Sequence, residues 1–253
     1  MRYIIIGAGA IGGTIGARLF ESGHKVVLAA RGPHYAALRD GGLRFATPAG
    51  TGTLPVPVVS EPGELSLRTG DVLILGVKTQ DSAAALDAWA WRPVTRGSVA
   101  AESLPVFCAQ NGVASERLAL RRFRQVYGVC VWLHATHLEP GAIEAQGAPL
   151  SGLLPVGRYP AGADETARQV AADLTHSAFG REPVAVQLRR RRAARHHPVR
   201  HPRPQQRVHL GVQDGSAAGA AELARRARAE GAAGAHRSRH RLRERRRASR
   251  PPQ

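Results

Sequence analysis

The sequence predicts an α/β fold of the Rossmann type, with a doubly wound and mostly parallel sheet, followed by a disordered basic tail. Three observations carry this prediction. A glycine-rich segment follows an apolar strand directly. Apolar segments of strand length then alternate with segments of helix length, which is typical of a parallel sheet with helices on both faces. Finally, the composition changes abruptly near residue 183.

The first strand, loop and helix are expected in residues 1–21. An apolar strand ending at Ile6 runs into a G-x-G-x-x-G sequence, and Ile11, Ile15 and Leu19 then recur every four residues, as on one face of a helix. This context favours dinucleotide binding over the alternative, a glycine-rich turn without a ligand. The predicted cofactor-binding residues here are Gly7, Ala8, Gly9, Ala10, Ile11 and Gly12.

The second strand, residues 25–30, ends at Arg31. Domains that prefer NAD usually place an acidic residue at this point, which accepts a hydrogen bond from the ribose 2′-hydroxyl. A guanidinium suits a 2′-phosphate instead, because it can donate two charge-assisted hydrogen bonds. Arg31 therefore predicts NADP(H) as the cofactor. The alternative is a solvated surface arginine.

The remaining elements follow in order up to residue 183. We expect short helices over residues 33–38 and 81–91, and an amphipathic helix over residues 165–179 with Val170, Leu174 and Ala178 on one face. A hairpin with a Pro-Gly turn is expected over residues 136–144. The other segments are predicted to be strands: residues 43–45, 54–59, 71–78, 104–109 and 126–133.

Lys78 and Asn111 each follow the carboxyl end of a predicted strand. Ligands of doubly wound sheets bind at that edge, so both side chains are expected to point toward the dinucleotide. A lysine there can meet a phosphate or an anionic substrate, and an asparagine can bond to ribose or to the nicotinamide amide. The alternatives are an exposed strand-end charge for Lys78 and a simple Asn-Gly turn for Asn111.

Several motifs in this order resemble the ketopantoate reductase (2-dehydropantoate 2-reductase) family over about residues 1–183. They are the glycine segment, Ala30-Arg31-Gly32 with Ala37-Leu38-Arg39-Asp40-Gly41-Gly42-Leu43, Val77-Lys78-Thr79-Gln80, Gln110-Asn111-Gly112-Val113 leading to Glu116, and Pro140-Gly141. The resemblance implies NADPH binding at the glycine segment and a 2′-phosphate contact from Arg31. It also implies a cofactor or substrate role for Lys78, and a place for Asn111 near the nicotinamide. The implied reaction reduces ketopantoate, a small 2-oxo acid, to pantoate in pantothenate biosynthesis.

In that family a helical second domain supplies a general-acid lysine and the asparagines that bind the substrate. This chain contains only two lysines, Lys25 and Lys78, and a single asparagine, Asn111. No catalytic residue is therefore identifiable. We expect an NADP-binding domain over residues 1–183 in which reduction of ketopantoate is absent or severely impaired. The alternatives are an NADP-binding module without catalysis, and a related dehydrogenase that acts on another 2-oxo or 3-hydroxy acid.

The predicted tail, residues 184–253, is rich in Arg, Ala and Pro. Residues 186–253 hold 19 Lys and Arg against four acidic residues, and only eight Val and Leu. So little apolar surface cannot offset chain entropy, and we expect disorder. One explanation is a high-GC gene read out of frame, with the helical domain lost or frameshifted. The other is a basic arm that binds polyanions such as nucleic acid without sequence preference.

The sequence also argues against a membrane protein, a secreted protein and a metal-binding protein. No run of 18 apolar residues indicates a membrane span, and the N-terminus does not resemble a secretion signal. The two cysteines, Cys108 and Cys130, lie in apolar segments and are interpreted as core residues of a cytoplasmic protein. His134 and His137 lack the further ligands that a metal site needs. No metal is predicted.

Overall fold

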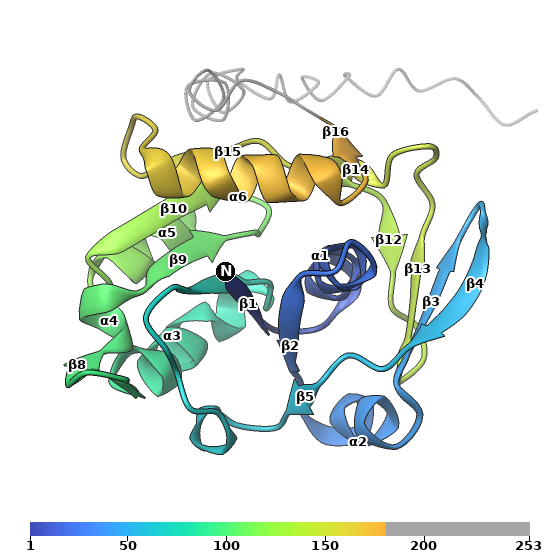
Figure 1. The fold of residues 1–253 in the computed structure, drawn as a ribbon, viewed down its shortest axis with the longest axis horizontal. Coiled ribbons are helices and arrows are strands. Elements are labelled where there is room, and N and C mark those ends of the chain that lie inside the picture. The colour runs from blue at the N-terminus through green and yellow to red at the C-terminus, as the bar shows by residue number, and fades with distance from the viewer. Residues whose placement is uncertain (181–253) are drawn as a thin grey trace, which may run out of the picture. The chain divides into compact units, whose positions relative to one another are not determined.

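The computed structural model describes residues 1–180. The expectations for the tail concern residues outside this range. The described chain forms a central sheet of seven strands in the order β15-β10-β9-β6-β1-β2-β5 (Figure 1). Its strands are β1 (Arg2–Ile6), β2 (Lys25–Ala29), β5 (Val58–Val59), β6 (Asp71–Leu75), β9 (Pro105–Cys108), β10 (Gln125–Val129) and β15 (Val156–Arg158). All neighbours pair in parallel except β10 and β15, which are antiparallel. The predicted doubly wound, mostly parallel sheet is confirmed.

The strand order reverses at β1, which lies between β2 and β6. The chain leaves β1 toward β2 on one side and returns to β6 on the other. The loops that follow β1 and β6 therefore diverge and leave a crevice at the carboxyl edge of the sheet. The predicted glycine segment and Lys78 both lie at this edge.

Helices cover both faces of the sheet, and the side chains of β1 show why. Tyr3 and Ile5 belong to one buried cluster with the apolar residues of α1 (Ala10–Glu21) and α6 (Glu165–His176), whereas Ile4 and Ile6 belong to a second cluster with those of α3 (Ser82–Ala90). Alternate residues of a strand face opposite sides, so β1 is apolar throughout because both its faces are covered. Figure 1 shows α1 and α6 on the same side of the sheet. The helices are α1 (Ala10–Glu21), α2 (Gly32–Gly41), α3 (Ser82–Ala90), α4 (Ala100–Ser103), α5 (Ala114–Leu120) and α6 (Glu165–His176), with 3-10 turns η1 (Pro62–Glu64) and η2 (Thr79–Asp81).

Three smaller sheets complete the described part. The four-stranded sheet has the order β12-β13-β3-β4 and includes the predicted hairpin, in which Ala135 pairs with Ala145 across the Pro140-Gly141 turn. The smaller strands are β3 (Leu43–Thr47), β4 (Gly50–Leu54), β7 (Pro93–Val94), β8 (Ser98–Val99), β11 (Trp132–Leu133), β12 (Ala135–Thr136), β13 (Ala142–Ala145), β14 (Gly152–Leu153) and β16 (Phe179–Gly180).

Two predicted strands are divided in the structure, and the predicted strand 71–78 ends at Leu75. The segment 54–59 is not one strand: β4 ends at Leu54 and β5 contains only Val58 and Val59, because Pro55 and Pro57 have no N–H to donate to a ladder. The segment 126–133 divides after Val129. Its second part, β11, pairs with β14 in a separate small sheet.

The last predicted helix is also shorter than expected. It ends at His176, where Ser177 donates its hydroxyl to the carbonyl of Asp173. Ala178 has a φ of 59° and lies outside the helix, so its placement on the helix face was wrong. Phe179 continues into β16. Val170 and Leu174 are buried, as predicted.

Tyr3 anchors the central strand to α6. Its hydroxyl donates a hydrogen bond to the carboxylate of Asp173, and both side chains are buried. Burial and this carboxylate raise the pKa of the Tyr3 hydroxyl far above its usual value, so the hydroxyl remains a donor.

We expect Tyr3→Phe to lower the free energy of unfolding by about 1.5–3 kcal/mol, since it removes a hydrogen bond to a charged group. In a domain of this size the melting temperature should fall by roughly 3–10 °C, as measured by circular dichroism. Tyr159→Phe is the control, because the Tyr159 hydroxyl makes no hydrogen bond within residues 1–180. Equal melting temperatures for the two variants would contradict the anchoring role.

Candidate dinucleotide site

The glycine segment forms the turn between β1 and α1. Gly7 has a φ of +97°, and a Cβ there would lie 2.6–2.9 Å from three atoms of Val77. A Cβ on Gly12 would overlap the carbonyl oxygen of Gly7. Both positions therefore need glycine for the turn and for the close packing of helix on strand. A Cβ on Gly9 would meet nothing within 4 Å, so this glycine faces open space that a ligand can occupy.

The N-terminus of α1 is open for an anion. Gly9 is its N-cap, no side chain of residues 1–180 caps it, and its first turn holds no acidic residue. The first N–H groups of a helix have no partner within the helix, and they point outward at the positive end of its dipole. These groups suit the negative charges of a pyrophosphate.

Two adjoining hollows meet over this segment. The first, of about 750 Å³, is lined by Gly9, Ala10, Ile11, Lys78 and Asn111, among others. The second, of about 230 Å³, is lined by Ala8, Gly9, Arg31 and Trp89, among others. Both are lined by the same five residues: Gly7, Gly9, Val77, Asp81 and His137.

The structure thus brings the predicted residues together around one centre. Arg31 lies on one side of the glycine segment, and Lys78 and Asn111 lie on the other. Gly12 lines neither hollow and serves the packing beneath them. Arg31 is the N-cap of α2, and both Arg31 and Lys78 are exposed. A dinucleotide that extends from Arg31 across the glycine segment to Asn111 would occupy both hollows.

Gln110 supports the Lys78 side of the site. It is 6% exposed, and its amide nitrogen donates hydrogen bonds to the carbonyl of Val77 and, at 2.8 Å, to the hydroxyl of Ser82. These bonds tie the turn after β6 to the end of β9, so Lys78 and Asn111 are held at neighbouring strand ends. The sequence motif included Gln110, but sequence reasoning gave it no role.

Sequence reasoning also missed Glu61, His34 and His137. Glu61 follows β5 and lines the hollow of Arg31, although it lies much further along the chain than the acid of an NAD fingerprint. His34 and His137 stand beside the glycine segment, and their rings contact each other with centroids 4.1 Å apart. They belong to α2 and to the hairpin, which are distant in sequence. The structure alone shows this contact.

Residues 1–180 contain no membrane-spanning helix, no metal-ligand cluster and no disulfide. None of the helices in residues 1–180 combines the length and apolarity that crossing a bilayer requires. The same residues contain no group of three His, Cys, Asp or Glu side chains placed to share a metal ion. Cys108 is buried in β9, whereas Cys130 is half-buried beyond the end of β10, and neither forms a disulfide within residues 1–180.

Comparison with known proteins identifies relatives of this region. Residues 3–160 match the family "Ketopantoate reductase PanE/ApbA". The 2-dehydropantoate 2-reductase of Pyrococcus abyssi is 29% identical over 178 residues, which are 70% of this chain and 54% of that protein. Its counterpart in Pyrococcus horikoshii is 28% identical over 170 residues, which are 67% and 52% of the two chains. The chain thus spans about half the length of the curated relatives it matches.

Solved structures agree with this assignment. A PanE/ApbA family ketopantoate reductase from Ralstonia eutropha JMP134 is similar with a TM-score of 0.59 and 25% identity, over 72% of this chain and 56% of that one. D-mandelate dehydrogenase in complex with NADH and anilino(oxo)acetate has a TM-score of 0.61 over the same shares, and at 21% identity it supports the fold alone. The family match extends over more than half of this chain, and the chain therefore belongs to the ketopantoate reductase PanE/ApbA family.

Proposed function

We propose that this chain binds NADP(H) and that its site serves the reduction of ketopantoate to pantoate, which the chain itself carries out slowly or not at all. The observation that carries the proposal is the meeting of two hollows over the glycine segment, with Arg31 in one and Lys78 and Asn111 in the other. The division into an NADP-binding domain, residues 1–183, and a basic tail, residues 184–253, is part of the proposal.

Each residue has a distinct task in this arrangement. The N–H groups at the start of α1 hold the pyrophosphate, and Arg31 binds the 2′-phosphate through two charge-assisted hydrogen bonds. Lys78 attracts a phosphate or the carboxylate of the 2-oxo acid, and Asn111 donates to ribose or to the nicotinamide amide. The bound cofactor supplies the hydride. A proton must also reach the developing alkoxide, and no residue of this chain is identified as its donor.

Arg31→Ala is expected to weaken NADPH binding about 10- to 100-fold and to leave NADH binding nearly unchanged. The reason is the loss of hydrogen bonds to a charged group, worth about 1.5–3 kcal/mol. Trp89 lines the same hollow as Arg31, so quenching of tryptophan fluorescence can report both titrations.

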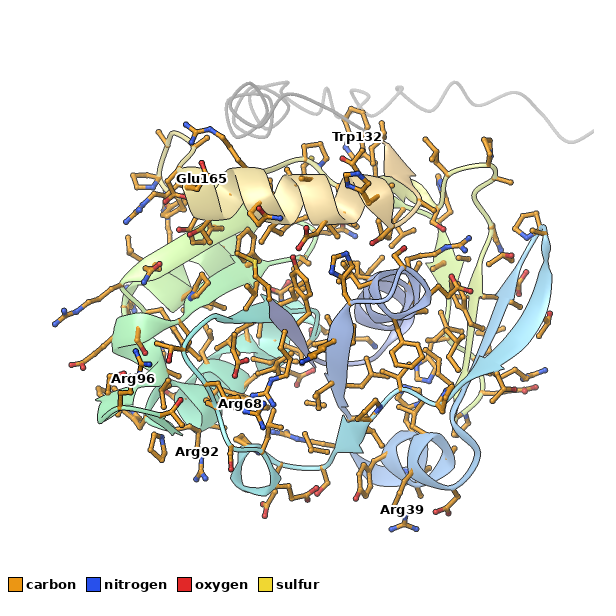
Figure 2. All side chains as sticks on the ribbon, in the orientation of Figure 1. Arg39, Arg68, Arg92, Arg96, Trp132 and Glu165 are labelled. Carbon is orange, nitrogen blue, oxygen red and sulfur yellow. The ribbon has the colours of Figure 1, made fainter. Side chains whose placement is uncertain are left out.

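Arg39→Ala is the matched control, because it removes the same charge from the same helix. Arg39 pairs with Asp40 and points away from α2 into solvent (Figure 2). If Arg31→Ala leaves the ratio of the two affinities unchanged, Arg31 does not select the cofactor. Glu61, which lines the same hollow, would then be the residue to test for an NADH preference.

A second candidate function is polyanion binding by the tail, as part of an NADP-binding or nucleic-acid-associated module without catalysis. It is favoured by the 19 Lys and Arg against four acidic residues in residues 186–253. Titration with RNA at two salt concentrations tests it, since such binding weakens steeply as salt rises. Binding that is absent at low salt would exclude this function.

A further inference from the structure

His34 connects the glycine segment to the β12–β13 hairpin. Its Nε2 lies 2.8 Å from the carbonyl oxygen of Ala8, and its Nδ1 lies 2.9 Å from the backbone nitrogen of Gly141. A carbonyl accepts, so Nε2 carries the proton; a backbone N–H donates, so Nδ1 carries none. His34 is thus a neutral ring that donates to one segment and accepts from the other.

His137 completes the connection from the hairpin side. Its Nε2 lies 3.2 Å from Nδ1 of His34, and the two rings are tilted against each other. His137 also lines both hollows, next to Gly7 and Gly9. The ring pair therefore stands beside the place where the pyrophosphate of a dinucleotide would lie.

Several charged groups surround the pair, and each must be considered before a proton is added. Both rings line the hollow of Arg31, Glu61 and Asp81, and His137 also lines the hollow of Lys78. On the hairpin itself, Glu139 is paired with Arg44. The two rings thus have two cations and two carboxylates as neighbours. The ion pair between Arg44 and Glu139 adds no net charge. Burial and then the electrostatic influence of the adjacent His34 ring lower the pKa of His137 below its usual value.

We propose that His34 and His137 are positioning residues for the phosphates of the dinucleotide, and that the site holds its shape only while Nδ1 of His34 carries no proton. His34 acts through the Ala8 carbonyl, which fixes the turn between Gly7 and Gly9. His137 acts through His34. A proton on Nδ1 of His34 would oppose the Gly141 N–H that donates to this nitrogen, and the bond between His34 and the hairpin would open. This inference rests on the proposed binding of NADP(H).

Two substitutions separate the two bonds of His34. In His34→Gln the side-chain amide can still donate to Ala8, whereas in His34→Asn the amide oxygen can still accept from Gly141. We expect His34→Ala and His34→Asn to weaken NADPH binding about tenfold, as the loss of one hydrogen bond would. His34→Gln should retain most of the affinity. Fluorescence titration of the full chain with NADPH measures this, and melting temperatures identify any variant that is unfolded.

The pH profile provides a readout that a merely structural role would not change. NADPH affinity of the unsubstituted chain should fall more steeply as the pH is lowered into the acid range than that of the double variant His34→Gln, His137→Asn. Both proteins are titrated with the same ligand, so protonation of the 2′-phosphate affects them equally.

The outcomes distinguish this inference from the proposed function. If the unsubstituted chain does not bind NADPH, the proposed function fails. If it binds, and His34→Asn matches His34→Gln in affinity with parallel pH profiles for the double variant and the parent, the positioning role is overturned while NADPH binding stands.

Discussion

In a direct assay, the purified chain is expected to bind NADPH and to reduce ketopantoate about 10²- to 10⁴-fold more slowly than a full-length relative. That range is the usual contribution of a positioned general acid. In ketopantoate reductases the resemblance assigns this role to a lysine of a helical domain, together with asparagines that hold the substrate. This chain has Lys25, on β2, and Lys78, at the site, and Asn111 is its single asparagine.

The measurement follows the loss of NADPH absorbance with ketopantoate at saturating cofactor. The 2-dehydropantoate 2-reductase of Pyrococcus abyssi serves as the reference, at a temperature at which both proteins are folded. Turnover within about tenfold of the reference would refute the expectation, since a lost general acid costs more than that. Lys78 would then be the first candidate for the proton donor, and Lys78→Met would be the variant to assay.

Gly12→Ala is expected to abolish measurable NADPH binding and to destabilise the described domain by about 1–3 kcal/mol, the usual cost of overpacking. The added Cβ would overlap the carbonyl oxygen of Gly7 and would lie 3.0 Å from Cγ2 of Ile5. The N-terminus of α1 must then move away from β1, and the loop proposed to receive the pyrophosphate changes shape. Thermal unfolding and NADPH titration measure the two effects.

Gly9→Ala is the matched control for this substitution. Its Cβ would meet nothing within 4 Å, and the position has no positive φ. We expect its melting temperature to stay within a few degrees of the parent, while its NADPH affinity falls because the methyl group occupies space that the ligand needs. If Gly9→Ala binds NADPH as well as the parent does, the pyrophosphate does not approach the chain at this glycine.

Local sequence patterns were sufficient to predict where the glycine turn and Arg31 lie in the fold. The turn between β1 and α1, and Arg31 after β2, lie in one continuous segment, and each step rests on a rule about strands, glycines or charge. Lys78 and Asn111 could be placed because parallel strands end at the same edge of a sheet. The described structure has all of them around Gly9.

Contacts between distant segments were not predictable in the same way. His34 lies in α2 and His137 in the hairpin, 103 residues later, and no periodicity links them. The predicted bounds of β11 were wrong for a related reason. Apolar runs such as residues 126–133 predict strand, but which sheet each half joins depends on partners elsewhere in the chain.

The position of β1 in the middle of the sheet has a consequence for how the protein is made. β1 precedes β2 and β6 along the chain and pairs with both, and the register brings Arg2 to Asp71, 69 residues later. Long-range parallel pairing of this kind is slow to form. The turn at Gly7–Gly12 is synthesised long before Asn111, so the proposed dinucleotide site cannot be complete until translation has passed β9.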